Sequence, residues 1–139
     1  YLLKLVTIRF SKILIVDDTQ IFRERTKKIL SDAKIGSKYY FAKDGKEAIS
    51  QYIAHKPHVV IMDIIMPNLD GVKASQAIMK FDPNAKIIVV STKDNQETIN
   101  AVIKSGFAKD YVFKPCDTSA IIMAVSKILS VKKKVEITT

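Results

Sequence analysis

The sequence predicts an α/β domain with a doubly wound, five-stranded parallel sheet and helices on both faces. Short apolar runs alternate with amphipathic stretches five times along the 139 residues. The apolar runs are nearly uninterrupted, as strands buried on both faces must be. The length fits one compact domain and leaves no room for a second folded one.

The first two strand–helix units occupy the first third of the chain. Residues 13–16 are a short apolar run and predict the first strand. Residues 20–33 predict the helix that follows, because their apolar side chains recur at helical spacing. Residues 39–42 predict a weaker second strand. Asp44 can cap the next helix, whose apolar residues fall on one face.

The third and fourth units follow the same pattern. Residues 59–63 predict a buried strand, and the helix after it is expected to begin at Asp70 and Gly71. Residues 87–90 predict the fourth strand and residues 96–104 the helix after it.

The fifth unit closes the folded region. Residues 111–113 predict a last short strand, and Asp117 or Thr118 is expected to cap the final helix. The first ten residues alternate polar and apolar side chains and lie outside the repeating pattern. We therefore expect an N-terminal extra segment, a folded domain and a C-terminal tail at residues 1–11, 12–131 and 132–139.

Composition excludes several classes of protein. The formal charge is +9, but the lysines are scattered and run together only at residues 132–134. Without an Arg-rich stripe or basic–aromatic interleaving, nucleic-acid binding is not the expected main role. Cys116 is the only cysteine, so a cytoplasmic setting is expected. No signal peptide or membrane span is predicted. Because the chain lacks an initiating Met, we expect that it is trimmed or cut from a longer protein.

Polar side chains follow four of the expected strands. In an open parallel sheet, active residues gather at the carboxyl ends of the strands. If the central strands are neighbours, three carboxylates, a hydroxyl and an ammonium converge on one patch. The residues at these ends are Asp17, Asp18, Asp63, Ser91, Thr92 and Lys114.

Three carboxylates in one patch require a cation or a raised pKa. Two carboxylates about 5 Å apart repel by roughly 3 kcal/mol at an effective dielectric constant near 20. Mg²⁺ suits oxygen ligands, keeps some of its waters and leaves room for a phosphoryl group. Singly, these residues have simpler roles as helix caps or surface charges. Their joint placement favours phosphoryl transfer to an aspartate.

Four motifs in order resemble the CheY-like receiver-domain family of two-component response regulators. They are residues 13–18 (ILIVDD), 63–71 (DIIMPNLDG), 89–92 (VVST) and 110–115 (DYVFKP). The resemblance covers roughly residues 12–131 and implies a flavodoxin-like sheet of strand order 2-1-3-4-5. It also implies Mg²⁺-dependent phosphorylation by a histidine kinase or phosphotransfer protein. Such a domain catalyses only its own phosphorylation and dephosphorylation.

The resemblance also implies which residues form the phosphorylation site. Asp63 is expected to be the phosphoacceptor, with Asp17 and Asp18 as the acidic pair. Asp18 is expected to ligate Mg²⁺ directly, whereas Asp17 acts largely through water. The backbone carbonyl of Ile65 is expected to be a further ligand.

The same resemblance implies a switch. Ser91 corresponds to the switch hydroxyl, Tyr111 to the switch aromatic and Lys114 to the phosphate-contacting lysine. Counting back from Lys114 instead selects Thr92, because residues 105–109 are one residue longer than usual. We favour Ser91. The surface of the fourth helix, fifth strand and fifth helix is expected to control a partner, a fused output domain or a second receiver in a homodimer.

Other classes of protein share parts of this pattern. A flavodoxin-like cofactor binder has the same fold, but Asp17 and Asp18 would repel the cofactor phosphate without a metal. Aspartate-dependent phosphatases place two aspartates one residue apart, whereas these two are adjacent. A histidine phosphotransfer protein would need a helical bundle, and here His55 and His58 flank Pro57 in an expected surface loop.

Overall fold

The computed structural model describes residues 2–92, 96–114 and 118–130, and the side chains from residue 6 onward within these ranges. The expected C-terminal tail, Cys116 and the proposed cap Asp117 lie outside the described residues. Among the described residues, no helix is long and apolar enough to span a membrane.

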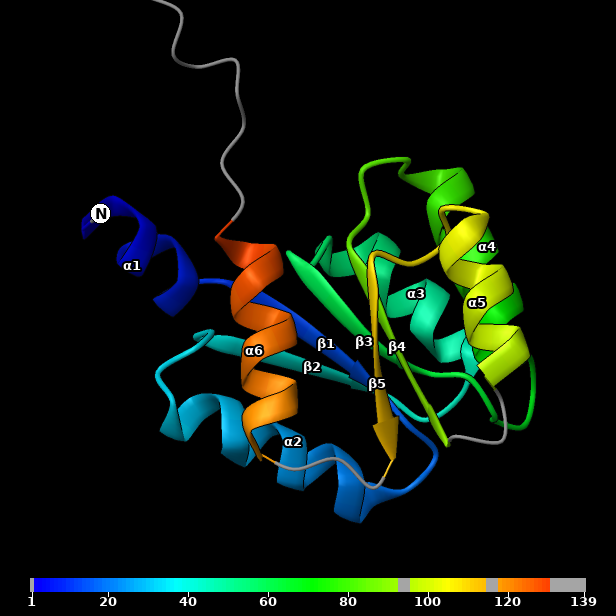
Figure 1. The fold of residues 1–139 in the computed structure, drawn as a ribbon, viewed down its shortest axis with the longest axis horizontal. Helices are drawn as coiled ribbons and strands as arrows, with labels where there is room; N and C mark the ends of the chain where they lie inside the picture. The colour runs from blue at the N-terminus through cyan, green and yellow to red at the C-terminus, as the bar shows by residue number, and fades with distance from the viewer. Residues whose placement is uncertain (1, 93–95, 115–117, 131–139) are drawn as a thin grey trace, which may run out of the picture.

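Five parallel strands form one sheet in the order β2-β1-β3-β4-β5, which confirms the expected fold (Figure 1). The strands are β1 (Lys12–Val16), β2 (Lys38–Ala42), β3 (Val59–Asp63), β4 (Ile87–Thr92) and β5 (Asp110–Lys114). β4 and β5 extend slightly beyond the apolar runs that predicted them, because their polar ends continue the sheet ladder.

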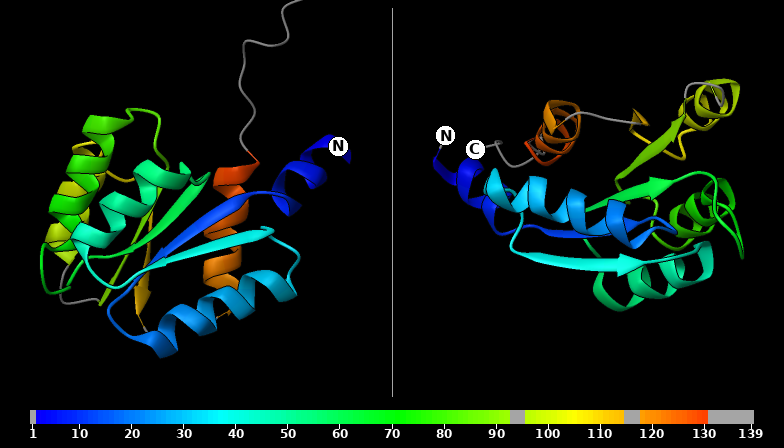
Figure 2. Two further views of the ribbon diagram at one scale, coloured as in Figure 1. Left: turned by 180° about the vertical axis from the view of Figure 1, so that it is seen from behind. Right: turned by 90° about the horizontal axis from the view of Figure 1, so that it is seen from below.

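Helices cover both faces of the sheet (Figures 1 and 2). They are α1 (Leu2–Arg9), α2 (Gln20–Asp32), α3 (Gly45–His55), α4 (Gly71–Phe81), α5 (Gln96–Lys104) and α6 (Thr118–Leu129). α2 and α6 pack on one apolar cluster, and α3, α4 and α5 pack on the other. Along β1, Ile13 and Ile15 enter the first cluster, whereas Leu14 and Val16 enter the second. This alternation explains the uninterrupted apolar runs.

The strand register brings the carboxyl ends of the central strands to one edge of the sheet. Val16 pairs with Met62, Asp63 pairs with Val90, and Thr92 pairs with Lys114. Residues at these strand ends are therefore neighbours in space, although they are far apart in the sequence.

The N-terminal extra segment forms a helix that the alternating sequence did not indicate. Ile8 of α1 packs against the apolar cluster beneath α2 and α6. Its backbone oxygen accepts a 2.9 Å hydrogen bond from the N–H of Gly36, and the Ser11 hydroxyl donates to the Thr7 oxygen at 2.6 Å. Tertiary contacts therefore hold α1 in place.

The expectation that both histidines lie in a surface loop was wrong for His55 but right for His58, which is exposed and precedes β3. His55 is the last residue of α3, and its ring stacks on Tyr40 with centroids 3.9 Å apart. The Nδ1 atom of His58 accepts a 2.8 Å hydrogen bond from the N–H of Lys12, at the start of β1. Both lie at the edge of the sheet opposite the acidic residues.

Candidate functional site

Three aspartates meet at the carboxyl edge of the sheet. Asp17 and Asp18 follow β1, and Asp63 ends β3. One carboxylate oxygen from each lies within 4.8 Å of the others. Asp17 and Asp63 are buried, whereas Asp18 is exposed. The structure thus brings together the three carboxylates that the strand-end pattern placed in one patch.

Both oxygens of Asp17 are engaged. Oδ1 accepts 2.8 Å hydrogen bonds from the N–H and the hydroxyl of Thr19, the N-cap residue of α2. Oδ2 accepts a 2.5 Å hydrogen bond from Nζ of Lys114. Burial opposes ionisation of Asp17, but these bonds together hold its pKa below the ordinary value of 3.8. Asp17 therefore stays ionised at neutral pH.

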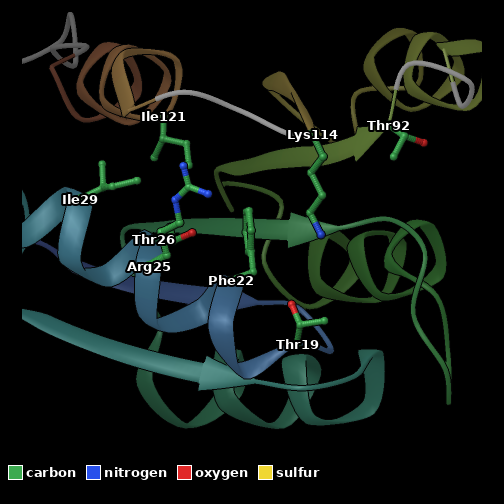
Figure 3. A pocket seen from close by; sticks show the side chains of 8 residues that line it. All are labelled: Thr19, Phe22, Arg25, Thr26, Ile29, Thr92, Lys114 and Ile121. Atoms are coloured by element: carbon green, nitrogen blue, oxygen red, sulfur yellow. The ribbon is translucent and has the colours of Figure 1, made fainter.

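Lys114 crosses the site from the end of β5 (Figure 3). Its Nζ atom lies 2.5 Å from Asp17, 3.4 Å from Asp63 and 4.4 Å from the ring centroid of Phe22. Burial disfavours the ammonium form, but the two carboxylates outweigh it and raise the pKa of Lys114. One ammonium thus serves two carboxylates and leaves the cluster negative.

Of the two buried carboxylates of the site, Asp63 is the less compensated by its partners. Burial is the main cause that raises its pKa to about 6, and the charge of Asp17 adds to the shift. Lys114 and the backbone N–H of Ile65 act in the opposite direction. A divalent cation would offset both the burial of this charge and its repulsion by Asp17, so the donor set fits a hard metal ion.

The loop between β3 and α4 runs beside Asp63 and contains Ile65, whose side chain is exposed. It returns to the sheet at Gly71, whose N–H donates to the oxygen of Ile64 at 2.8 Å. A Cβ atom on Gly71 would lie only 2.0 Å from the backbone oxygen of Asp63. Only glycine allows α4 to start so close to the strand end.

Ser91 and Thr92 lie in different environments. Ser91 is 2% exposed, and its hydroxyl oxygen has no hydrogen-bond partner among the described residues. Thr92 is exposed and lines a pocket of about 240 Å³ beside Lys114, between α2 and α6 (Figure 3). Tyr111, which pairs in register with Val89, is 42% exposed, and its ring centroid lies 5.1 Å from that of Phe113.

Residues 13–126 match the response regulator receiver domain family. The chain belongs to this family. Receiver domains accept a phosphoryl group and thereby control a partner or an output domain. This signalling role is the function of the domain. The match sets the chain apart from flavodoxin-like cofactor binders, which the fold alone left open.

Curated relatives of this receiver include both short and long proteins. The chemotaxis protein CheY of Thermotoga maritima is 40% identical over 119 residues, which cover 84% of this chain and 96% of that protein. The transcriptional regulatory protein DegU of Brevibacillus brevis is 34% identical, and its match covers 84% of this chain but 49% of that protein. Receivers thus occur both nearly alone and within longer regulators.

Solved structures of other receivers have the same fold. The response regulator domain of T. maritima CheB aligns with a TM-score of 0.78 and 29% identity, and covers 89% of this chain and 99% of that chain. The receiver domain of NtrX from Brucella abortus aligns with a TM-score of 0.79 and 30% identity, and the alignment covers 86% of this chain and 99% of that chain.

Sequence reasoning missed several contacts in this receiver. Asp44 caps α3 as predicted, with the N–H of Glu47 donating to Oδ1 at 2.8 Å. Its second oxygen accepts from the side chain of Asn68, which no local pattern indicated. The contact of Lys114 with the ring of Phe22 was likewise missed, because Phe22 is one of the apolar residues at helical spacing that predicted the helix of residues 20–33.

Proposed function

We propose that Asp63 is the phosphoacceptor of this receiver and that Mg²⁺ binds beside it. The observation that carries the proposal is the meeting of three carboxylates with a single ammonium at the carboxyl edge of the sheet. The receiver would occupy residues 12–131, with α1 as an N-terminal addition. The single cysteine supports a cytoplasmic location.

The magnesium ligands would be Asp18, Asp63 and the backbone carbonyl of Ile65, with Asp17 acting through water. Asp17 already uses both oxygens for Thr19 and Lys114, whereas Asp18 is exposed and makes no hydrogen bond or ion pair within the described part of the chain. Asp18 is therefore the freer direct ligand. The ion would neutralise charge on carboxylate and phosphoryl oxygens.

The chain's own residues would carry out the transfer. A carboxylate oxygen of Asp63 attacks the phosphorus of a phosphohistidine on a histidine kinase or phosphotransfer protein. The new O–P bond forms as the P–N bond breaks, and the imidazole takes the bonding electrons and a proton from solvent. Lys114 leaves the carboxylates and binds a phosphoryl oxygen. Hydrolysis of the aspartyl phosphate at the same site would reset the domain.

The signal would leave through the surface formed by α5, β5 and α6. Because α1 precedes the repeating units, these helices are the fourth and fifth of the pattern expected from the sequence. The buried hydroxyl of Ser91 is a free donor that can turn to a phosphoryl oxygen, and the half-exposed ring of Tyr111 can then move inward. This surface exposes Lys104, Lys109 and Lys127. Its partner would be an acidic protein segment, a fused output domain or a second receiver.

Mass spectrometry of the intact protein tests the proposal. Incubation with Mg²⁺ and a small acyl phosphate should add one phosphoryl group to the wild type and none to Asp63→Asn. Asp32→Asn, which alters an exposed carboxylate on α2, is the matched control and should be modified normally. Equal rates of modification in wild type and Asp63→Asn would show that the acceptor is another residue.

A further inference from the structure

The loop between β3 and α4 has a costly backbone. Asn68 and Leu69 have φ angles of 52° and 88°, in the left-handed region that favours glycine. Asn tolerates this conformation better than most residues, but Leu does not. Such a backbone persists only where the surrounding structure holds it.

The start of α3 is what holds it. The N–H of Gly45 donates to the backbone oxygen of Leu69 at 3.0 Å. A Cβ atom on Gly45 would lie 2.2 Å from that oxygen, so only glycine permits this approach. Beside it, the side-chain amide of Asn68 donates to Oδ2 of Asp44 at 3.3 Å.

The buried carboxylate of Asp44 therefore has two separate tasks. Oδ1 accepts from the N–H of Glu47 and caps α3 at 2.8 Å, whereas Oδ2 accepts from Asn68. The capping bond is local to α3. The second bond crosses 24 residues of sequence to the loop that follows the phosphoacceptor.

The other end of this loop contacts Asp63 itself. The N–H of Ile65 interacts with the Asp63 carboxylate, and the carbonyl of Ile65 is the proposed magnesium ligand. A displacement of residues 68 and 69 would pass through the backbone of Pro67 and Met66 to Ile65. The geometry of the site thus depends on where the loop is anchored.

We propose that Asp44 is a positioning residue for the phosphorylation site, because its bond to Asn68 anchors the β3–α4 loop and thereby fixes the backbone of Ile65 beside Asp63. This inference rests on the proposed function of Asp63 and Mg²⁺. Asp44 touches neither metal nor phosphoryl group. It acts through Asn68 and the loop, as outer residues that orient metal ligands do.

Two substitutions of Asn68 remove the bond and leave the cap of α3 intact. Asn68→Gly tolerates the left-handed φ and removes the donor without adding charge. Asn68→Asp is isosteric and places a carboxylate against Asp44. We expect each to weaken Mg²⁺ affinity, for Asn68→Gly by about tenfold. Isothermal titration calorimetry with Mg²⁺ alone measures the change. Asn84→Gly, in a turn remote from the site, is the control for added loop flexibility and should leave affinity unchanged.

Reversal of the pair separates positioning from general destabilisation. In the double variant Asp44→Asn with Asn68→Asp, the amide donates to the carboxylate in the opposite direction, and the new amide oxygen still caps α3. This variant keeps the wild-type net charge and should restore Mg²⁺ affinity to within about twofold. Affinity that remains as low as in Asn68→Asp alone would overturn the proposal.

Amide hydrogen exchange of the metal-free protein measures directly how firmly the β3–α4 loop is held against the start of α3. The Gly45 and Ile65 amides should exchange faster in Asn68→Gly than in wild type, and the Glu47 amide, which reports the cap, should not change. Unchanged protection together with unchanged Mg²⁺ affinity would overturn the positioning role. Wild type that binds no Mg²⁺ would overturn the proposed function, whereas the exchange data would still decide whether Asp44 anchors the loop.

Discussion

The Nζ atom of Lys114 lies 2.5 Å from Oδ2 of Asp17, although 97 residues separate the two in sequence. The bond joins the ends of β5 and β1, which are not neighbours in the sheet, and crosses β3 and β4. Asp63 lies beneath it at the end of β3 and has the longer contact of 3.4 Å with the same ammonium. Lys114 is thus held mainly by a carboxylate that is not the proposed acceptor, and it can move to a phosphoryl group without leaving the site.

Lys114→Ala should lower the stability of the metal-free protein by about 1–3 kcal/mol, because buried Asp17 loses a charged partner. Denaturant unfolding with and without Mg²⁺ measures this. Mg²⁺ should stabilise the variant more than the wild type, since the ion replaces the missing positive charge. The variant should still accept a phosphoryl group but bind its output partner poorly. Unchanged partner binding by phosphorylated Lys114→Ala would contradict the assigned role.

Mg²⁺ binding should weaken at mildly acidic pH. The metal needs an ionised Asp63, whose pKa in the metal-free protein is about 6. Below that value affinity should fall by about tenfold per pH unit, because protons compete with the ion. Calorimetric titrations between pH 5 and pH 8 check this. A constant affinity over that range would show that Asp63 is not the group that titrates.

The same raised pKa predicts that Asp63→Asn stabilises the metal-free protein at neutral pH. A carboxyl whose pKa is higher in the folded state binds more protons there than in the unfolded state. Stability is therefore lost as the pH rises from about 4 to about 6. Asn does not ionise and so escapes this loss. The gain in the free energy of unfolding over wild type should therefore be largest above pH 6 and small near pH 4. A gain independent of pH would point to packing instead.

The two aspartates after β1 should differ in their effect on the metal. Asp18→Ala removes the exposed carboxylate that has no other partner in the described structure, and should weaken Mg²⁺ affinity strongly. Asp17→Ala should weaken it less, because both Asp17 oxygens are already bonded to Thr19 and Lys114. The Mg²⁺-induced rise in melting temperature ranks the two variants. Equal affinity in wild type and Asp18→Ala would remove Asp18 from the ligand set.

The N-terminal helix should contribute stability without affecting the site. Ile8→Ala should lower the free energy of unfolding by about 1–2 kcal/mol, since Ile8 is half-buried against the cluster of α2 and α6. Val6→Ala is the matched control, because Val6 is 47% exposed and should matter little. Mg²⁺ affinity should be unchanged in both. A loss of affinity in Ile8→Ala would link α1 to the acidic edge.

The acidic edge was predictable because parallel strands align their carboxyl ends. If the central strands are neighbours, the polar residues at their ends must lie close together, and Asp17, Asp63 and Lys114 do so. Which carboxylate holds the ammonium was not predictable, because it depends on rotamers and on the Thr19 bonds.

Other features depend on contacts that leave no local pattern. α1 has no clear apolar stripe, and it is held by Ile8 and by backbone bonds to Gly36 and Ser11. The sequence around Asp44 predicted a helix cap, but capping uses only one of its two carboxylate oxygens. Its bond to Asn68 is possible because β2 and β3 run parallel with only β1 between them, so the loops that follow them lie at the same edge of the sheet.

Ser91 is expected to supply the hydroxyl that senses the phosphoryl group. Ser91 ends the buried part of β4, and its hydroxyl has no partner within the described residues, so a new acceptor nearby would satisfy it. A phosphoryl group adds charge and strong acceptor oxygens, and a charge-assisted hydrogen bond would draw Ser91 toward Asp63. Ser91→Ala should therefore accept a phosphoryl group at close to the normal rate but lose the response of Tyr111 and α5.

Two-dimensional NMR spectra before and after phosphorylation check this. In wild type, amide shifts should change around Tyr111 and along α5, because space vacated by Ser91 admits the aromatic ring. Ser91→Ala should mute these changes. Thr92→Ala is the matched control, since Thr92 is exposed and lies on the pocket side of β4. Muted changes in Thr92→Ala with normal changes in Ser91→Ala would assign the switch to Thr92. Normal changes in both variants would show that this receiver transmits its signal without a hydroxyl switch.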